Sequence, residues 1–195
     1  MTNNIEQIKK LLTFESEDDF YFLQIIKRKK EHPELGSNSY IVKTYFISSI
    51  ENLEKHMGEI ICLCDFHNAR AGINLNKRSF RRIAFHNLKK ITDQILNEEY
   101  RSVRKSYNSV CGGYSNETSK KWIIDIDDKQ FDHTIISDIL KTIQPIDVED
   151  KIITKLETKN GYHLITSPFN VGEFRQNCDL LIDIHKDNPT ILYIP

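Results

Sequence analysis

The chain has few of the residues on which several classes of protein depend. It contains four cysteines (Cys62, Cys64, Cys111 and Cys178), none of them in a CxxC pair, which is too sparse for a disulfide framework. Cys62 and Cys64 alternate in the apolar run IICLC, which predicts that they share one face of a strand. A zinc site that adds His67 to these two thiols is conceivable, but buried free thiols are common and we favour that interpretation.

Long apolar runs are also missing from the sequence. None approaches the roughly 20 residues that a helix needs to cross a bilayer. The first ten residues, MTNNIEQIKK, lack the apolar segment of a secretory signal. We therefore expect an intracellular, cytoplasmic protein with no membrane partner. The hydrophobic fraction of 39% is low but sufficient for the core of one compact domain.

The net charge of −1 is uninformative, but the charges are segregated along the chain. Residues 76–90 contain six basic side chains and no acid, whereas residues 125–150 contain eight acids and two lysines. Each cluster by itself is typical of a solvated face. Together, they suit a protein that holds a polyanion on one element and metal cations on another.

The first hundred residues (1–100) predict an N-terminal α/β lobe. Residues 20–30 and 39–47 are rich in β-branched and aromatic side chains and predict a hairpin. Strands are predicted at 59–66 and in the segment RAGINLN that follows. The strongest helix signal covers 79–97, where an apolar stripe is formed by Phe80, Ala84, Leu88, Ile91 and Ile95.

Residues 101–120 lack periodicity and contain a Gly-Gly pair, which predicts a long basic loop. Residues 121–195 then predict the order β-α-β-β-α-β-β, in which the last two strands, DLLIDIH and TILYIP, form a hairpin around KDNP. The predicted fold class is α+β. We expect a mixed sheet with helices on one face, an RRM-like catalytic half packed on the N-terminal lobe, within one compact domain.

The segment WIIDIDD places two carboxylates at the end of an apolar strand. Side chains at i and i+2 of a strand point the same way, so Asp125 and Asp127 are expected to converge on one side of the sheet. Two facing carboxylates repel each other unless a cation lies between them. Mg²⁺ or Mn²⁺ would satisfy that requirement, and two such ions form the catalytic clamp of polymerases and nucleases. A solvated strand end is the simpler alternative.

Two further motifs follow on later strands. In NGYHLIT, Gly161 permits close backbone approach and His163 projects from one face of a strand, where it could contact a phosphate or move a proton. The apolar run DLLID ends in Asp183, which we favour as a third acid over Asp187 in the predicted turn. Lys186 is a candidate for contact with a nucleotide.

In this order, hhhDhD, then GxH, then hhhD, the motifs resemble those of the archaeo-eukaryotic primase superfamily, the primase-polymerases. The resemblance covers roughly residues 120–195 and matches Asp125 with Asp127, Gly161 with His163, and Asp183. It implies that the acids bind two divalent metals and that the histidine contacts the triphosphate of the incoming nucleotide. The family often has serine where Gly161 stands, so one phosphate-contacting hydroxyl is missing here.

The resemblance also implies partners. A nucleotidyltransferase of this type acts on nucleoside triphosphates and a DNA or RNA template, with a replicative helicase as a candidate partner, as in small stand-alone primases of phages and mobile elements. Basic side chains would neutralise the phosphates of the nucleic acid. The candidates for that role are Arg70, Lys77, Arg78, Arg81 and Arg82.

Two other functions use the same residues. A magnesium-dependent nuclease would employ the same acids and His163, and sequence does not separate the two reactions. A catalytically silent RRM-like module that binds nucleic acid is the third alternative. Such modules stack bases on aromatic side chains of adjacent strands, where this chain has acids and a histidine.

Overall fold

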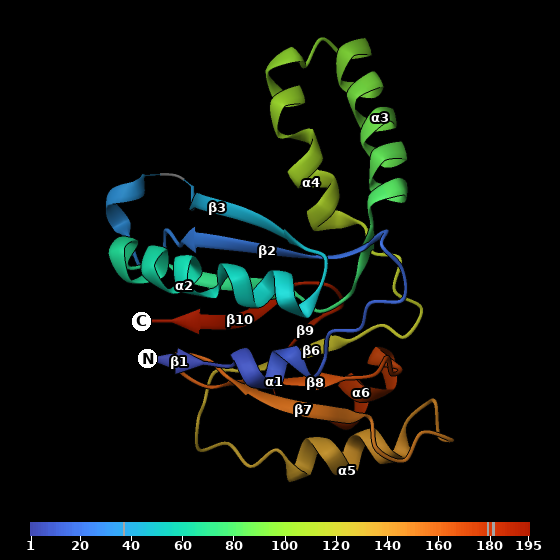
Figure 1. The fold of residues 1–195 in the computed structure, drawn as a ribbon. Helices are drawn as coiled ribbons and strands as arrows, with labels where there is room; N and C mark the ends of the chain where they lie inside the picture. Colours follow the sequence, from blue (N-terminus) through green and yellow to red (C-terminus); the bar gives the residue numbers. More distant parts are fainter. Residues whose placement is uncertain (37, 179, 181) are drawn as a thin grey trace.

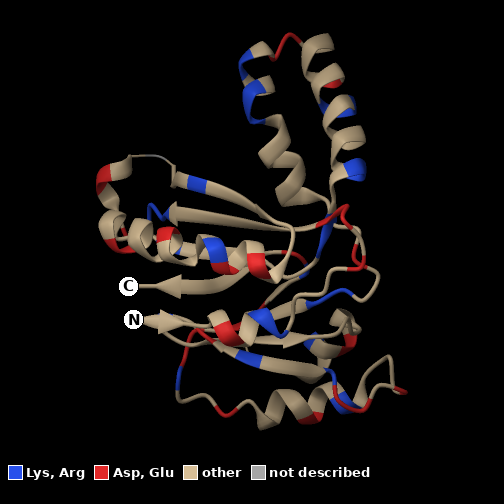
Figure 2. Ribbon diagram, in the orientation of Figure 1, with Lys and Arg blue, Asp and Glu red and all other residues tan. Residues whose placement is uncertain are grey.

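The computed structural model describes residues 1–195 except 37, 179 and 181, and forms two β-sheets with helices packed against both (Figure 1). Most residues of the strands are uncharged (Figure 2), as expected for sheets that supply the core. The α+β class is confirmed. The predicted mixed sheet is wrong, because every strand pairing in the described residues is antiparallel.

The larger sheet has the order β1-β10-β4-β2-β3, and the short strand β5 pairs with β2. The bounds of its strands are Thr2–Asn3 (β1), Asp19–Lys27 (β2), Tyr40–Ile47 (β3), Arg70–Asn74 (β4), Arg78–Ser79 (β5) and Pro189–Ile194 (β10). The predicted hairpin is confirmed as β2 and β3, which a short 3-10 helix, η1 (Pro33–Leu35), connects.

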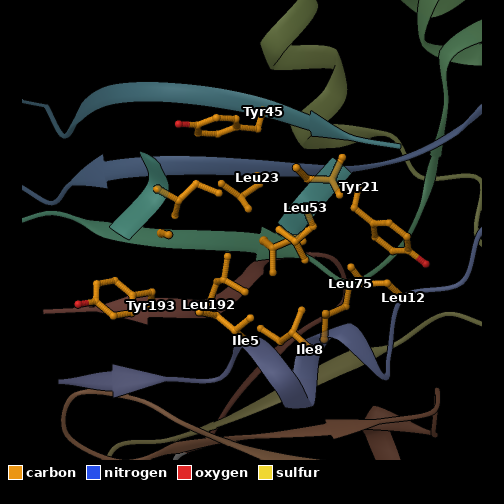
Figure 3. Close-up of a cluster of buried hydrophobic side chains, with 14 of the residues drawn as sticks. Ile5, Ile8, Leu12, Tyr21, Leu23, Tyr45, Leu53, Leu75, Leu192 and Tyr193 are labelled. Atoms are coloured by element: carbon orange, nitrogen blue, oxygen red, sulfur yellow. The ribbon is translucent and has the colours of Figure 1, made fainter. Parts of the chain in front are cut away.

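Helices α1 (Ile5–Lys9) and α2 (Ile50–His67) cover one face of this sheet, and the apolar side chains between them form the largest core cluster (Figure 3). The strand predicted at 59–66 is wrong, because these residues continue α2. The hydroxyl of Ser49 caps the helix, and Leu53, Ile60 and Cys64 recur at helical spacing on its buried side. Cys62 is exposed, so it does not share a face with Cys64.

A helical hairpin stands out from the body in Figure 1. It consists of α3 (Phe80–Leu96), η2 (Tyr100–Lys105) and α4 (Ser106–Gly113). Its base packs on Phe20 and Phe22 of β2 through Ile83 and Val110. The basic loop predicted at 101–120 is therefore largely wrong, since contacts with α3 hold most of it in η2 and α4.

The predicted helix over 79–97 is confirmed as α3, but its predicted buried stripe is wrong. Ile83 and Gln94 are the buried residues of the helix, and Gln94 accepts a hydrogen bond from Ser106 of α4. Leu88 and Ile95, which the stripe included, are exposed. An apolar stripe thus faces solvent.

The smaller sheet has the order β7-β8-β6-β9, and α5 and α6 lie on one of its faces. The bounds of these elements are Trp122–Ile126 (β6), Thr134–Thr142 (α5), Ile152–Glu157 (β7), Tyr162–Thr166 (β8), Val171–Asn177 (α6) and Asp183–His185 (β9). They follow the predicted order. Residues 179 and 181, at the start of the strand predicted over DLLIDIH, lie outside the described residues.

The predicted C-terminal hairpin is wrong, because its two strands belong to different sheets. β9 pairs with β6 of the smaller sheet, whereas β10 crosses to the larger sheet and lies between β1 and β4. The predicted 121–195 unit is therefore not self-contained. Ile123, Leu156 and Ile165 of the smaller sheet also join the core cluster of the larger one. None of the helices in the described part of the chain is both long enough and apolar enough to cross a bilayer.

Candidate active site between the two sheets

The register of the smaller sheet places the three predicted motifs in a single row. Asp125 lies directly opposite His163 of β8 on one side and directly opposite Asp183 of β9 on the other. Directly opposite residues of antiparallel strands carry their side chains on the same face. Residues that lie 38 and 58 positions from Asp125 in the sequence are therefore its neighbours on adjacent strands.

Asp127 follows the end of β6, and its side chain lines the same cleft as those of Asp125 and His163. It is exposed, whereas the Asp125 side chain keeps 29% of its surface accessible. The predicted convergence of the two carboxylates on one side of the sheet agrees with this placement. Asp183 is exposed on the edge strand and is not among the residues that line the cleft.

Gly161 allows β8 to begin close against the end of β6. A Cβ atom added at this position would lie 1.8 Å from the carbonyl oxygen of Ile126. Any other residue would therefore push the two strands apart, two residues before His163. The predicted close backbone approach is present, but Gly161 is buried and does not line the cleft, so its predicted contact with a nucleotide finds no support.

The imidazole of His163 is held between the two sheets. Its Nδ1 lies 2.8 Å from the hydroxyl oxygen of Thr190 on β10, and its Nε2 lies 3.4 Å from Oδ1 of Asp125. The contact with His163 is the main cause that lowers the pKa of Asp125, against the opposing effect of burial. Asp125 is therefore held as a carboxylate beside an oriented imidazole.

The cleft has a volume of about 560 Å³, which is in the range of sites for small molecules. Acids Asp125 and Asp127 come from the smaller sheet. Most of the facing bases come from the larger sheet and the loop after β2, and the full set of bases is Arg28, Lys30, Arg70 and Lys159. An acidic wall therefore faces a mainly basic wall, an arrangement that suits an anion bridged by a cation.

Glu31 links two of these bases. Its carboxylate contacts the guanidinium of Arg70, and its Oε1 lies 3.7 Å from Nζ of Lys159. Burial lowers the pKa of Arg70, but the group remains charged at neutral pH. Arg70, which was predicted to bind nucleic acid, lines the same cleft as Asp125 and Asp127.

The predictions that Lys77 and Arg78 bind nucleic acid are wrong, because both side chains are buried. Arg78 is fully buried, and its Nη2 donates to Oδ2 of Asp187 at 2.9 Å. Nζ of Lys77 lies 2.9 Å from Oε1 of Glu15. Their charges are neutralised inside the fold. The ion pair with Arg78 occupies the carboxylate of Asp187, so Asp187 is not available as a metal ligand. Asp183 remains as the third acid.

Lys186 also lies in an unexpected place. Its Nζ is 4.9 Å from the centroid of the Trp122 ring, and Trp122 packs with the cluster beneath α5 and α6. Lys186 follows the end of β9 and does not line the cleft, so its predicted contact with a nucleotide finds no support there. Arg81 and Arg82 are exposed at the start of α3.

Carboxylates of Asp125, Asp127 and Asp183 are the donors that Mg²⁺ and Mn²⁺ prefer. Among the described residues, however, no three His, Cys, Asp or Glu side chains gather closely enough to form a ready-made metal site. Asp125 and Asp183 nevertheless occupy directly opposite positions, an arrangement that costs stability when no cation compensates it. The residue types suit a divalent cation.

No family model, curated protein or solved structure matches this chain.

Sequence reasoning missed Arg28, Lys159 and His185, which line the cleft, and Thr190, which contacts His163 from behind it. Thr190 contacts His163 only because β10 crosses to the other sheet, and nothing in TILYIP signals that crossing. His185 was within reach of a periodicity argument, since it lies two residues beyond Asp183 on the same strand.

Proposed function

We propose that the chain is a nucleotidyltransferase of the primase-polymerase type, which uses two divalent metals to join nucleotides on a DNA or RNA template. The single observation that carries this proposal is the row formed by His163, Asp125 and Asp183, with Asp127 at its end and the basic wall opposite. The strand order β7-β8-β6-β9, with α5 and α6 on one face, supports the RRM-like expectation for this half.

Each part of the cleft has a role in this proposal. Asp125 and Asp127 of the cleft, together with Asp183 on the neighbouring edge strand, would hold the metal ions, which would supply neutralisation of phosphate charge and activation of the attacking hydroxyl. Arg28, Arg70 and Lys159 receive the phosphates of the nucleoside triphosphate. His163, which Thr190 orients and which lines the same cleft, would contact the same phosphates.

The reaction is an in-line displacement at the α-phosphorus. The oxygen of a ribose or deoxyribose 3′-hydroxyl forms the new P–O bond, the bond between the α- and β-phosphates breaks, and pyrophosphate leaves while the hydroxyl proton passes to solvent. Most of the protein's contribution is positioning and charge neutralisation. This fits a site whose side chains are carboxylates and bases rather than nucleophiles.

The test is incorporation of labelled nucleoside triphosphates on primed and unprimed single-stranded templates, with Mg²⁺ or Mn²⁺. The wild type should incorporate nucleotide, and Asp125→Asn and Asp183→Asn should each abolish incorporation while the protein remains folded. Asp138→Asn is the matched control, because Asp138 is an exposed acid on α5, on the other face of the sheet.

The same gels separate the alternatives. Shortening of the template without incorporation, abolished by the same two substitutions, would assign the cleft to a nuclease. Neither activity in the well-folded wild type with either metal would reject catalysis by this chain alone. Binding of a labelled oligonucleotide would then leave the silent RRM-like module as the remaining function.

A further inference from the structure

The carboxylate of Glu31 lies between two bases of the cleft. Its Oε1 contacts the guanidinium of Arg70 and lies 3.7 Å from Nζ of Lys159. A phosphate oxygen bound at this place would be held in the same way, because arginine and lysine are the side chains that bind phosphate as well as carboxylate. Glu31 therefore fills a position that an anionic ligand of the cleft would need.

The contact with Glu31 uses only part of the Arg70 guanidinium. Among the described residues, its hydrogen bonds are limited to the one that Nη2 donates to Glu31. Its Nε is buried without an acceptor, although burying an N–H group unpaired costs stability. The Arg78–Asp187 pair, in contrast, forms two hydrogen bonds between the charged groups themselves. The contact between Arg70 and Glu31 is therefore not saturated.

The turn that carries Glu31 is anchored through its backbone and through the next residue. The N–H groups of Glu31 and His32 donate to the carbonyl of Arg28 at 2.9 and 3.0 Å. His32 is buried, and its Nε2 lies 2.7 Å from the carbonyl oxygen of Asn68. The Glu31 side chain, however, keeps 26% of its surface accessible. Its carboxylate can therefore leave Arg70 by side-chain rotation, without movement of the turn.

We propose that Glu31 is a built-in competitor of the phosphate chain. Its carboxylate occupies the anion position at Arg70 and Lys159, and a nucleoside triphosphate binds there by displacing that carboxylate into solvent. The inference rests on the proposed function, which supplies the triphosphate as the ligand. Carboxylate and phosphate do not share the position, because two anions at contact distance repel each other. Binding thus exchanges an internal anion for an external one.

A ligand with several phosphates is best able to make this exchange. Arg28 and Lys30 line the same cleft, and neither forms an ion pair within 4.0 Å with another described residue. A polyphosphate can contact these two bases while one of its phosphates takes the place of Glu31. The new contacts then offset the loss of the internal ion pair.

Two other roles of Glu31 predict different effects of its removal. If Glu31 holds Arg70 in the orientation that the ligand needs, both contact Arg70 at once, and removing the carboxylate weakens binding. If Glu31 acts only through its charge at a distance, any variant that keeps the charge binds as the wild type does. A competitor differs from both, because its effect depends on contact and its removal strengthens binding.

The first test measures binding of inorganic tripolyphosphate to the full chain by isothermal titration calorimetry, without divalent metal and at about 0.15 M salt, where distant charges are screened. Glu31→Gln should lower the dissociation constant roughly three- to tenfold, and Arg70→Gln should raise it about tenfold. Glu59→Gln is the matched control. It removes the same charge from an ion pair with Lys43 outside the cleft and should leave the dissociation constant unchanged.

The second test separates contact from charge. Glu31→Asp keeps the charge but shortens the side chain by one methylene, so the carboxylate no longer reaches Arg70 from the anchored turn. Most of the gain in affinity should therefore persist in this variant. In protein that already carries Arg70→Gln, Glu31→Gln should give a smaller gain than in the wild type, because the competition at Arg70 has been removed.

Four results would overturn the proposal. They are a Glu31→Gln variant that binds tripolyphosphate no better than the wild type, a Glu31→Asp variant with the affinity of the wild type, an equal gain with and without Arg70, and no binding of tripolyphosphate by any of these proteins.

The titration requires neither template nor catalysis, so its outcome is separate from that of the proposed function. A gain in affinity by Glu31→Gln, in a protein that incorporates no nucleotide, would reject the polymerase and keep the competing carboxylate. Incorporation of nucleotide by a protein in which Glu31→Gln changes nothing would do the reverse.

Discussion

Two groups of charged side chains in this protein contain the same residue types and differ in their access to water. In the first, Arg78 is fully buried and shares its donors among Asp187 and backbone carbonyls of Asn76 and Cys111. In the second, Asp125, Asp127 and the bases opposite them border an open cleft.

The difference lies in how much capacity each charge keeps for a ligand. The Arg78–Asp187 pair is saturated with hydrogen bonds, so it fixes the fold and has no capacity left for a ligand. In the cleft, Asp125 contacts His163 but keeps 29% of its side-chain surface accessible, and Asp127 is exposed. Burial with satisfied partners indicates a structural role, whereas charges that stay open to water remain available to a ligand.

The largest loss of stability is expected from breaking the Arg78–Asp187 ion pair. Arg78→Met leaves the partly buried Asp187 carboxylate without its counter-ion and the carbonyls of Asn76 and Cys111 without their donor, and should lower the free energy of unfolding by roughly 3 kcal/mol. Urea denaturation measures this loss. Arg175→Met, at an exposed arginine of α6, should change stability little. Equal stabilities of the two variants would contradict a structural role for the pair.

Gly161→Ala should cause a smaller loss of stability, and it tests how the cleft depends on the spacing of β6 and β8. The added methyl group would meet the carbonyl of Ile126, so the strands must move apart, at a cost of about 1–3 kcal/mol. Incorporation of nucleotide should fall more than stability predicts, because His163 shifts relative to Asp125. Gly112→Ala, at a helical glycine with open space around it, is the control and should not destabilise.

Asp183→Asn should change stability by less than about 1 kcal/mol, and in the direction of greater stability, because it removes one of two directly opposed carboxylates. Asp187→Asn should instead destabilise, since Arg78 would lose its counter-ion. Thermal unfolding of both variants at neutral pH checks the contrast. A marked loss of stability in Asp183→Asn would contradict this expectation and would give Asp183 a structural role like that of Asp187.

The smallest effect concerns pH. His163 lowers the pKa of Asp125 below its ordinary value of 3.8, so the stability that this contact contributes is fully present above that value and is lost as the pH falls through the lower, folded-state pKa. His163→Ala should raise the pKa of Asp125 and remove this loss. Titration of the Asp125 carboxyl carbon by NMR, in wild type and variant, measures the shift directly.

Local patterns of the sequence predicted most strands and the row of Asp125, His163 and Asp183, because alternation and spacing are local signals. They failed where contacts between distant segments decide the structure. The run IICLC reads as a strand, yet continuity with the capped helix before it places Cys64 in the core of α2. The choice of basic residues for binding nucleic acid depended on their exposure, which the sequence does not reveal. Arg78, one of those chosen, is buried.

The path of β10 has a consequence for synthesis of the protein on the ribosome. This strand lies between β1 and β4 in the larger sheet, and it carries Thr190, which orients His163. While residues 189–194 are still inside the exit tunnel, β1 has no neighbour and the histidine lacks its hydroxyl partner. The sheet and the cleft can therefore be completed only after these residues emerge.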